Sequence, residues 1–480
     1  MTLSKPIILL VALSLAVRLV FFVLVRPWDP VAVGNVILKF DAADYNQLAS
    51  TLLHERQFSY QKDGPPDALR TPLYPIFIAM TYSIFGEAPW VVLLIQIVMD
   101  TCSCILLFLM LSRVLNSRVA WWASLFYAVD PFLILHSVSL LSDTLFVFLC
   151  VAGSYVLAKA LPERFGAGTT RSILWSAVLL GLATLVRPVS QYLVVLIPLA
   201  MLIVLRKNLR RFFVAAAVFV SAFMCTIAPW LARNFVAFGE PSLSTSGAFN
   251  LLLLYAGPME MERRNLTIDE LGTELFREAD DMMRRDGLDP KTLNPFQQAR
   301  YWRKLGIQYI VNDPAAFVKY SFVGLMHAYT NLSTRAFADM LHLQRGATEF
   351  DMKLYPNVID LVKEFLRQKS TAEIVLGGFI ALSLVVSYVL LAVGLAMAWK
   401  TTQDKSFFIF CIAMVLYFTL IGGPYGIARY RMPAIPFYLG FVGIGAMFLV
   451  HRRKTSESPE LSLPDSVAAP GEAEMGNASK

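Results

Sequence analysis

Long runs of apolar residues, separated by short polar connections, make up most of this chain. A helix needs about 20 apolar residues to cross the hydrocarbon core of a bilayer. The pattern predicts ten membrane-spanning helices, at residues 7–25, 90–111, 119–137, 140–158, 172–186, 189–205, 212–230, 374–399, 406–421 and 433–451. No small-residue cleavage site follows the first run, so we interpret it as a retained helix rather than a signal peptide.

The amino-acid composition agrees with this pattern. Of the 480 residues, 56% are hydrophobic and only 16% are charged, whereas a soluble protein carries about 25% charged residues. The sequence therefore predicts an all-α polytopic membrane protein. Its five cysteines all lie within apolar runs, without a C-x-x-C pair or a histidine-rich cluster. This distribution argues against a disulfide framework or a zinc site.

Basic residues cluster in alternate connections between the predicted helices. They are Arg113 and Arg118, then Lys159, Arg164 and Arg171, then RKNLRR at 206–211, then Lys400 and Lys405, and finally HRRK at 451–454. Cytoplasmic loops carry an excess of lysine and arginine, so we place these connections and both termini in the cytoplasm. The net charge of +7 then indicates contact with the membrane surface rather than with nucleic acid.

Two shorter apolar stretches, at 72–86 and 315–329, do not fit this alternation. Counting either one as a span would move RKNLRR or HRRK to the outer face, so we predict that both are interfacial helices on the outer side. Two large outer segments result, at 26–89 and 231–373, and the second contains a polar, helical stretch at 259–312. The predicted parts are an N-terminal transmembrane module (1–230), an outer segment (231–373), C-terminal transmembrane helices (374–454) and a disordered cytoplasmic tail (455–480).

Acids and arginines gather at the outer ends of the predicted helices. Arginine there runs against the positive-inside bias, and charges near a bilayer are costly unless they pair or serve a function. A guanidinium matches the geometry of phosphate, and a carboxylate can take a proton from an attacking hydroxyl. The pattern therefore favours a substrate with a lipid-borne phosphate leaving group and a nucleophilic acceptor. The residues concerned are Asp41, Asp44, Arg70, Asp143, Arg187, Arg233, Asn234, Arg429 and Arg431.

Purely structural interpretations exist for the same residues. The three acids are placed to cap or begin helices, Arg187 to extend from a helix end to the interface, and the last two arginines to contact lipid headgroups. Within the helices, we expect Arg18 to reach the inner membrane surface. We expect Asp100 and Asp130 to be structural hydrogen-bond partners.

The order of the sequence motifs resembles that of a known family. After the first helix comes D-x-x-x-Y (41–45), followed by RTPLYPIFIAMTYSIFG (70–86), SLLSDTLF (139–146), GLATLVRP (181–188), PWLARN (229–234) and RYRMPAIP (429–436). This succession, over roughly residues 7–450, resembles the membrane glycosyltransferases of the GT-C class. More narrowly, it is similar to glycosyltransferase family 39 and its relatives, the dolichyl-phosphate-mannose protein mannosyltransferases and the aminoarabinose transferases of lipid A.

The resemblance implies a GT-C-like bundle of about ten transmembrane helices and an inverting enzyme. A sugar would pass from a polyprenyl phosphate to an acceptor on the outer face, without a cofactor. Asp41 matches the catalytic carboxylate and Tyr45 the aromatic residue four positions later, while Asp143 matches the acid at the start of the fourth helix. Relatives often carry Asp-Glu where this chain has Asp41-Ala42, so the choice between Asp41 and Asp44 as the base stays open. The resemblance assigns the donor phosphate to Arg70, Arg187, Arg233, Arg429 and Arg431, and positioning of the acceptor or sugar to Tyr45, Tyr74, Asn234 and Tyr430.

Other functions fit some of the same features. A transporter or flippase of lipid-linked sugars would also place arginines around a cavity, but it is expected to show internal repeats and broken helices at the bilayer midplane. A polysaccharide polymerase or ligase uses similar donors, with its main motifs on a late loop. A non-catalytic scaffold would tolerate the loss of Asp41, and a divalent metal on Asp41 and Asp44 is a further alternative.

The expected location is a bacterial inner membrane, with the endoplasmic reticulum as the alternative. The expected partners are a polyprenyl-phosphate sugar donor, membrane lipids, and an acceptor that is a glycan, a lipid or a protein.

Overall fold

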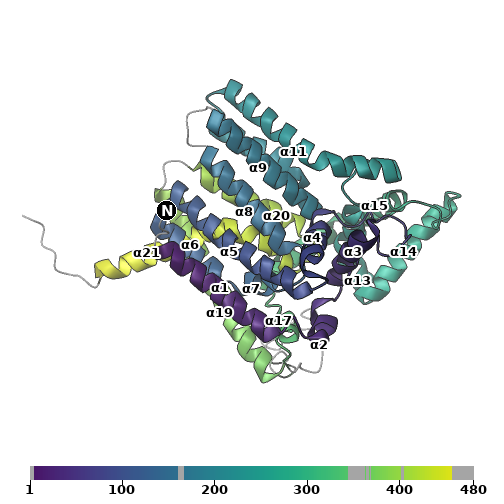
Figure 1. The fold of residues 1–480 in the computed structure, drawn as a ribbon, viewed down its shortest axis with the longest axis horizontal. Helices are drawn as coiled ribbons and strands as arrows, with labels where there is room; N and C mark the ends of the chain where they lie inside the picture. Colours follow the sequence, from purple (N-terminus) through teal and green to yellow (C-terminus); the bar gives the residue numbers. More distant parts are fainter. Residues whose placement is uncertain are drawn as a thin grey trace, which may run out of the picture.

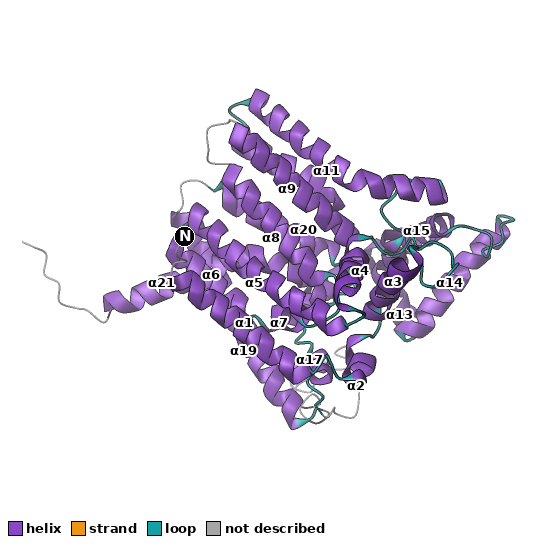
Figure 2. Cartoon of the chain, viewed as in Figure 1, coloured by secondary structure: helices purple, strands orange, loops and turns teal. Residues whose placement is uncertain are grey.

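The computed structural model is a bundle of long helices that carries a layer of shorter helices at one end (Figure 1). It describes residues 5–160, 167–343, 363, 367, 369–401 and 405–456. These residues form helices and loops and contain no strand (Figure 2). The expectation of an all-α polytopic protein is therefore confirmed for the described part of the chain.

The long helices of the bundle follow the predicted apolar runs. They are α1 (Lys5–Val25), α5 (Pro89–Val114), α6 (Ser117–Val129), α7 (Pro131–Ser137), α8 (Asp143–Ala160), α9 (Ala167–Val186), α10 (Leu193–Leu205), α11 (Leu209–Phe238), α19 (Thr371–Thr401), α20 (Ser406–Ile421) and α21 (Ile435–Ser456). Two short 3₁₀ helices, η2 (Pro188–Tyr192) and η5 (Ala428–Ala434), precede α10 and α21.

Eight described helices are long and apolar enough to cross a membrane. The predicted span 119–137 instead forms two helices, α6 and α7, that meet at an angle of 55°. The break lies at Asp130 and Pro131, because a proline ring cannot continue the preceding helix and the Asp130 side chain accepts hydrogen bonds from the first amides of α7. The remaining predicted span, 406–421, is α20, which has 16 residues.

The shorter helices lie at the end of the bundle opposite to the N-terminus of α1 and the end of α21 (Figure 1). They are α2 (Pro30–Ala32), η1 (Val33–Ile37), α3 (Asp41–Glu55), α4 (Leu73–Phe85), α12 (Ser246–Asn250), η3 (Leu251–Ala256), α13 (Gly257–Arg264), α14 (Ile268–Arg285), α15 (Pro295–Asn312), α16 (Pro314–Thr330) and α17 (Thr334–Met340). The polar stretch predicted to be helical at 259–312 corresponds to α13–α15. The predicted tail lies outside the described residues from 457 onward.

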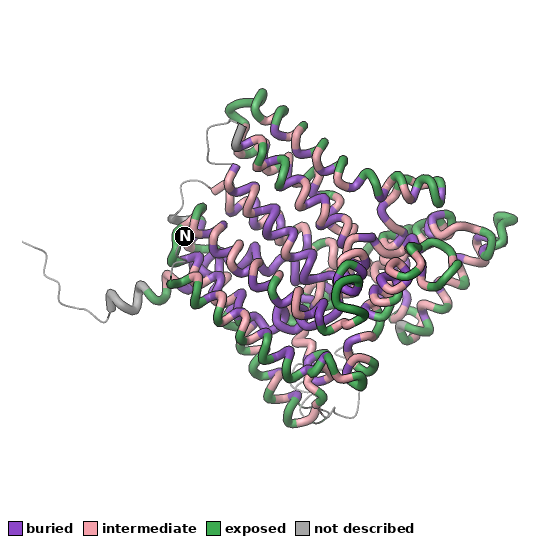
Figure 3. Tube along the Cα trace, viewed as in Figure 1, coloured by how far each residue is buried: buried purple, intermediate pink, exposed green. Residues whose placement is uncertain are grey.

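Burial divides the helices of the bundle into central and peripheral ones. Buried residues dominate α5, α8 and α21, whereas most apolar side chains of α1, α10 and α11 are at least partly exposed (Figure 3). In a membrane protein, such exposed apolar faces are the ones that contact lipid. The central helices approach closely through small residues, and a Cβ atom on Gly394 of α19 would overlap the carbonyl of Phe441 in α21.

Arg18 does not reach the membrane surface as expected. Its side chain is fully buried in α1, and its Nε donates a hydrogen bond to Asp100 Oδ2 of α5 at 2.5 Å. The other oxygen of Asp100 accepts from the Tyr127 hydroxyl of α6 at 2.6 Å. Pairing within the bundle satisfies the two charges better than extension through an apolar layer, so Asp100 has the structural role that was expected of it.

Candidate functional site

The two acids of the first outer segment lie in the first turn of α3. Phe40 precedes the helix with φ 51° and ψ −127°, and Asp41 and Asp44 follow it. Residues three apart on a helix share a face, so the two carboxylates point in one direction. The helix dipole favours negative charge at this position, but it does not account for the partners of the two acids.

Arg70 joins these two carboxylates. Its Nη2 donates to Asp41 Oδ1 and to Asp44 Oδ2, each at 2.7 Å. The loop before α4 presents this side chain, because the Asp67 carboxylate accepts from the backbone amide of Arg70 at 2.8 Å. The guanidinium of Arg70 also lies 5.1 Å from the centre of the Tyr45 ring. Arg70 therefore holds α3 against the start of α4.

Arg429 connects Asp41 to Asp143 at the start of α8. Its Nη2 donates to Asp41 Oδ2 at 2.9 Å, and its Nε lies 3.4 Å from Asp143 Oδ2. The other oxygen of Asp143 accepts a hydrogen bond from Arg187, the residue that follows α9. Residues 388 positions apart in the chain thus meet at one point.

These contacts define an ion-pair cluster of three carboxylates and three guanidiniums, namely Asp41, Asp44, Asp143, Arg70, Arg187 and Arg429. The Asp143 side chain is 1% exposed and the Asp44 side chain 41%, so the cluster reaches from the interior to the surface. Burial disfavours the charged form of Asp41. The guanidiniums of Arg429 and Arg70 outweigh this effect and hold the pKa of Asp41 well below its usual range.

Several buried polar atoms in and around the cluster have no hydrogen-bond partner among the described residues. They are Tyr60 Oη, Arg70 Nε, His136 Nδ1, Asp143 Oδ2 and Arg429 Nε. Tyr60 interacts electrostatically with Asp44 and Arg70, and His136 does so with Asp143 and Arg429. Buried polar groups are nearly always hydrogen-bonded, so these atoms offer donors and acceptors to an incoming ligand.

Aromatic and amide side chains support the cluster from the bundle. The Tyr45 hydroxyl lies 3.2 Å from Ser142 Oγ, and its ring packs edge-on against Tyr74 at 4.8 Å between centroids. The Tyr74 hydroxyl donates to Gln96 Oε1 at 2.7 Å, and Gln96 Nε2 donates to the Ser139 carbonyl at 2.7 Å. Gln96 and Ser142 were not predicted as site residues. The signal for Gln96 was a polar residue within an apolar run.

Two of the arginines expected to bind phosphate contact main-chain carbonyls instead. Arg233 Nη1 donates to the Asp67 carbonyl at 2.9 Å, in the loop that presents Arg70. Arg431 is buried and donates to carbonyls at the end of α16. Neither forms a described ion pair with the cluster. Asn234 and Tyr430 were expected to position the acceptor or sugar: Asn234 bonds the Ser242 carbonyl at 2.5 Å, and Tyr430 is half-buried beside Arg429.

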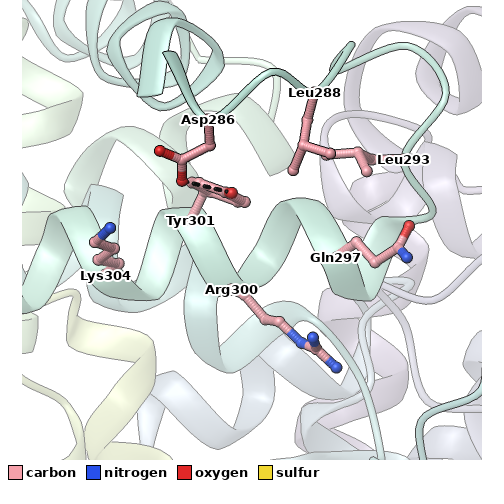
Figure 4. Close-up of a pocket in the computed structure, with 7 residues that line it drawn as sticks. All are labelled: Asp286, Leu288, Leu293, Gln297, Arg300, Tyr301 and Lys304. Atoms are coloured by element: carbon pink, nitrogen blue, oxygen red, sulfur yellow. Dashed lines mark hydrogen bonds between the residues drawn. The ribbon is translucent and has the colours of Figure 1, made fainter. Parts of the chain in front are cut away.

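A cavity of about 350 Å³ lies away from the cluster, between the end of α14 and α15 (Figure 4). It is lined by Asp286, Leu288, Leu293, Gln297, Arg300, Tyr301 and Lys304. The Tyr301 hydroxyl donates to Asp286 at 2.9 Å, and Arg300 pairs with Glu240. Most of its charged groups are therefore already paired, whereas the ion-pair cluster keeps unpaired buried atoms.

Comparison with known proteins supports the resemblance found in the sequence. Residues 69–232 match the family described as dolichyl-phosphate-mannose-protein mannosyltransferase, and this segment contains Arg70, Asp143 and Arg187 of the cluster. The resemblance to GT-C glycosyltransferases is therefore confirmed over these residues. No curated protein sequence matches the chain.

The chain also has matches among solved structures, at low identity. The oligosaccharyltransferase AglB from Archaeoglobus fulgidus, in complex with an inhibitory peptide and a dolichol-phosphate, has 10% identity and a TM-score of 0.48. That match covers 95% of this chain and 52% of the other, so the chain spans about half the length of the archaeal protein. ArnT from Cupriavidus metallidurans bound to undecaprenyl phosphate has 14% identity and a TM-score of 0.43, over 95% of this chain and 80% of the other.

Proposed function

We propose that this protein transfers a sugar from a polyprenyl-phosphate donor to an acceptor on the outer face of the membrane, with inversion at the anomeric carbon. One observation carries the proposal. Asp41 lies between Arg70 and Arg429, and Arg429 also faces Asp143 and Arg187. A carboxylate and several guanidiniums at one point suit general base catalysis beside a phosphate leaving group.

We assign the donor phosphate to Arg70, Arg187 and Arg429. In the ion-pair cluster their charges are balanced by carboxylates, so phosphate oxygens would compete for the same donors. The Nε atoms of Arg70 and Arg429, which form no hydrogen bond among the described residues, can donate to such oxygens without breaking an existing hydrogen bond. Fixed guanidiniums then stabilise the negative charge that develops on the phosphate as the sugar leaves.

We assign the role of general base to Asp41, because it contacts both Arg70 and Arg429, whereas Asp44 contacts only Arg70. Asp41 takes the proton of the acceptor hydroxyl or amine, and the acceptor atom bonds to the anomeric carbon. The bond from that carbon to the phosphate oxygen breaks, and its electron pair stays on the phosphate. Two guanidiniums make Asp41 a weak base in the free protein, so a donor that engages them would restore its basicity.

The remaining features fit supporting roles in this proposal. Tyr45 and Tyr74 are buried and pack against each other beside the cluster, so we assign them to the support of α3, and Arg233 and Arg431 support the backbone around the site. The scheme uses no metal. A divalent ion on Asp41 and Asp44 is the alternative, which predicts that chelation with EDTA stops turnover and that a metal restores it. A bacterial inner membrane with both termini cytoplasmic is part of the proposal.

The test is sugar-dependent release of polyprenyl phosphate by the purified protein in nanodiscs, over a panel of polyprenyl-phosphate sugars and acceptors. Turnover by the wild type is expected, and Asp41→Asn should lose about 10²–10⁴-fold in rate while still binding the donor. Asp63→Asn is the matched control, because Asp63 lies exposed in the same outer segment. Donor binding without turnover in the wild type and in both variants would contradict the proposal and favour a transporter or a scaffold.

A further inference from the structure

Arg431 is the most completely buried arginine near the ion-pair cluster, yet it does not join it. The residue is 1% exposed. Its Nη1 donates to the carbonyls of Ala328 at 3.1 Å and Tyr329 at 3.0 Å. These are the last carbonyls of α16, which no helical amide can satisfy. Arg431 thus caps a helix of the outer segment from inside the bundle.

We propose that Arg431 is a positioning residue that sets the pose of Arg429 by fixing η5 between α16 and α7. This inference rests on the proposed function. Three residues make one turn of a 3₁₀ helix, so side chains two positions apart leave η5 in different directions. The Arg429 side chain extends to Asp41 and Asp143. The Arg431 side chain extends to the end of α16.

Arg431 has a second contact, with α7. Its guanidinium lies 3.6 Å from the centre of the Phe132 ring, a distance at which the two planes stack. Phe132 is the second residue of α7, and its backbone amide donates to the Asp130 cap at 2.9 Å. The chain leaving α7 leads directly to Asp143. Arg431 therefore contacts α7, the helix that precedes the short connection to Asp143, and Asp143 is the residue that Arg429 Nε faces.

The backbone before η5 is fixed against α16 in a second way. A Cβ atom on Gly324 of α16 would overlap the carbonyls of Gly423 and Pro424, and one on Gly426 would overlap Gly324. In addition, the Tyr329 hydroxyl lies 2.5 Å from Thr419 Oγ1 at the end of α20. Such direct backbone contact leaves little freedom for the loop that ends at Arg429.

This arrangement couples the outer segment to the proposed phosphate site. Helix α16 packs against η3, α13 and α15 of that segment as well as against η5. A displacement of α16 would therefore move the carbonyls that Arg431 holds, and with them the backbone that bears Arg429. The outer segment can thus affect the arginine that we assign to the donor phosphate.

A double-mutant cycle with Arg429 separates positioning from direct phosphate binding. Arg431→Met should lower sugar transfer by about 10²-fold, as expected for a misplaced catalytic group. In the Arg429→Met background the same change should add less than about twofold, because residues that act through each other are not additive. An equal loss in both backgrounds, or no loss in the single variant, overturns the proposal. Arg303→Met, an exposed arginine on α15, is the control and should retain activity.

Hydrogen exchange gives a readout that does not depend on turnover. In Arg431→Met, backbone amides of residues 423–431 should exchange faster than in the wild type and in Arg303→Met, and undecaprenyl phosphate should bind more weakly. Arg431→Lys should fold and restore part of both signals, and Gly324→Ala should reproduce the exchange effect. Unchanged exchange in Arg431→Met overturns the positioning role. Absence of turnover in the wild type would instead overturn the proposed function and leave the exchange result valid.

Discussion

Replacing Arg18 by methionine removes one partner of a buried ion pair and leaves the other in place. The change deletes the contact with Asp100 at 2.5 Å and the donation to the Ala128 carbonyl at 2.8 Å. Asp100 then keeps only the Tyr127 hydroxyl as a partner. Methionine fills a similar volume, so the cost is electrostatic rather than that of a cavity.

The size of the effect follows from the burial of both groups. Their side chains are 0% and 3% exposed, and breaking a buried pair by removing one partner costs about 3–5 kcal/mol. We expect a value near the lower end, about 3 kcal/mol, because Asp100 keeps its hydrogen bond from the Tyr127 hydroxyl. The double variant Arg18→Met/Asp100→Asn removes both charges. Its free energy of unfolding should lie within about 1 kcal/mol of the wild-type value, because replacing a buried ion pair by neutral side chains often changes stability little.

Unfolding in mixed detergent and SDS micelles, followed by tryptophan fluorescence, measures these free energies. The exposed Arg303→Met variant is the control for the same substitution. A cost below about 1 kcal/mol for Arg18→Met, the range of a solvated surface pair, would refute the reasoning. A double variant as unstable as the sum of the two single variants would refute it as well.

Three other predictions concern packing, catalysis and pH. Gly394→Ala should separate α19 from α21 and destabilise the protein by about 1–3 kcal/mol, whereas Gly378→Ala on the same helix, with nothing within 4 Å, should be neutral or slightly stabilising in the same SDS assay. Asp44→Asn should reduce sugar transfer less than Asp41→Asn, because Asp44 contacts one arginine and Asp41 two; a larger loss would make Asp44 the base. The lowered pKa of Asp41 means that its ion pairs stabilise the folded state above about pH 4 and lose this effect as the pH falls further. The unfolding midpoint of the wild type should therefore drop more between pH 4 and about pH 2 than that of Asp41→Asn, and equal drops would contradict the pairing.

Sequence patterns were sufficient to predict most of the bundle. Each predicted span has a corresponding helix except 119–137, which forms two, because apolar length is the main requirement for crossing a bilayer. The bend at Asp130 was not predicted, although Pro131 marks its place. The hydropathy pattern of 119–137 is continuous, and only the packing of α7 against its neighbours shows that the helix turns there.

The sequence by itself determined which residue types stand at the outer ends of the helices, and it correctly grouped Asp41, Asp44 and Asp143 with some of the arginines. Only the tertiary structure decided which arginines meet those acids. Arg429 and Arg431 stand two positions apart in one motif, yet the first faces Asp41 and the second faces the carbonyls of α16. Arg18 was likewise expected at the membrane surface and instead pairs with Asp100. The reason is that the partner of an arginine depends on the direction in which its helix presents the side chain and on elements distant in the chain. The neighbouring residues in the sequence determine neither.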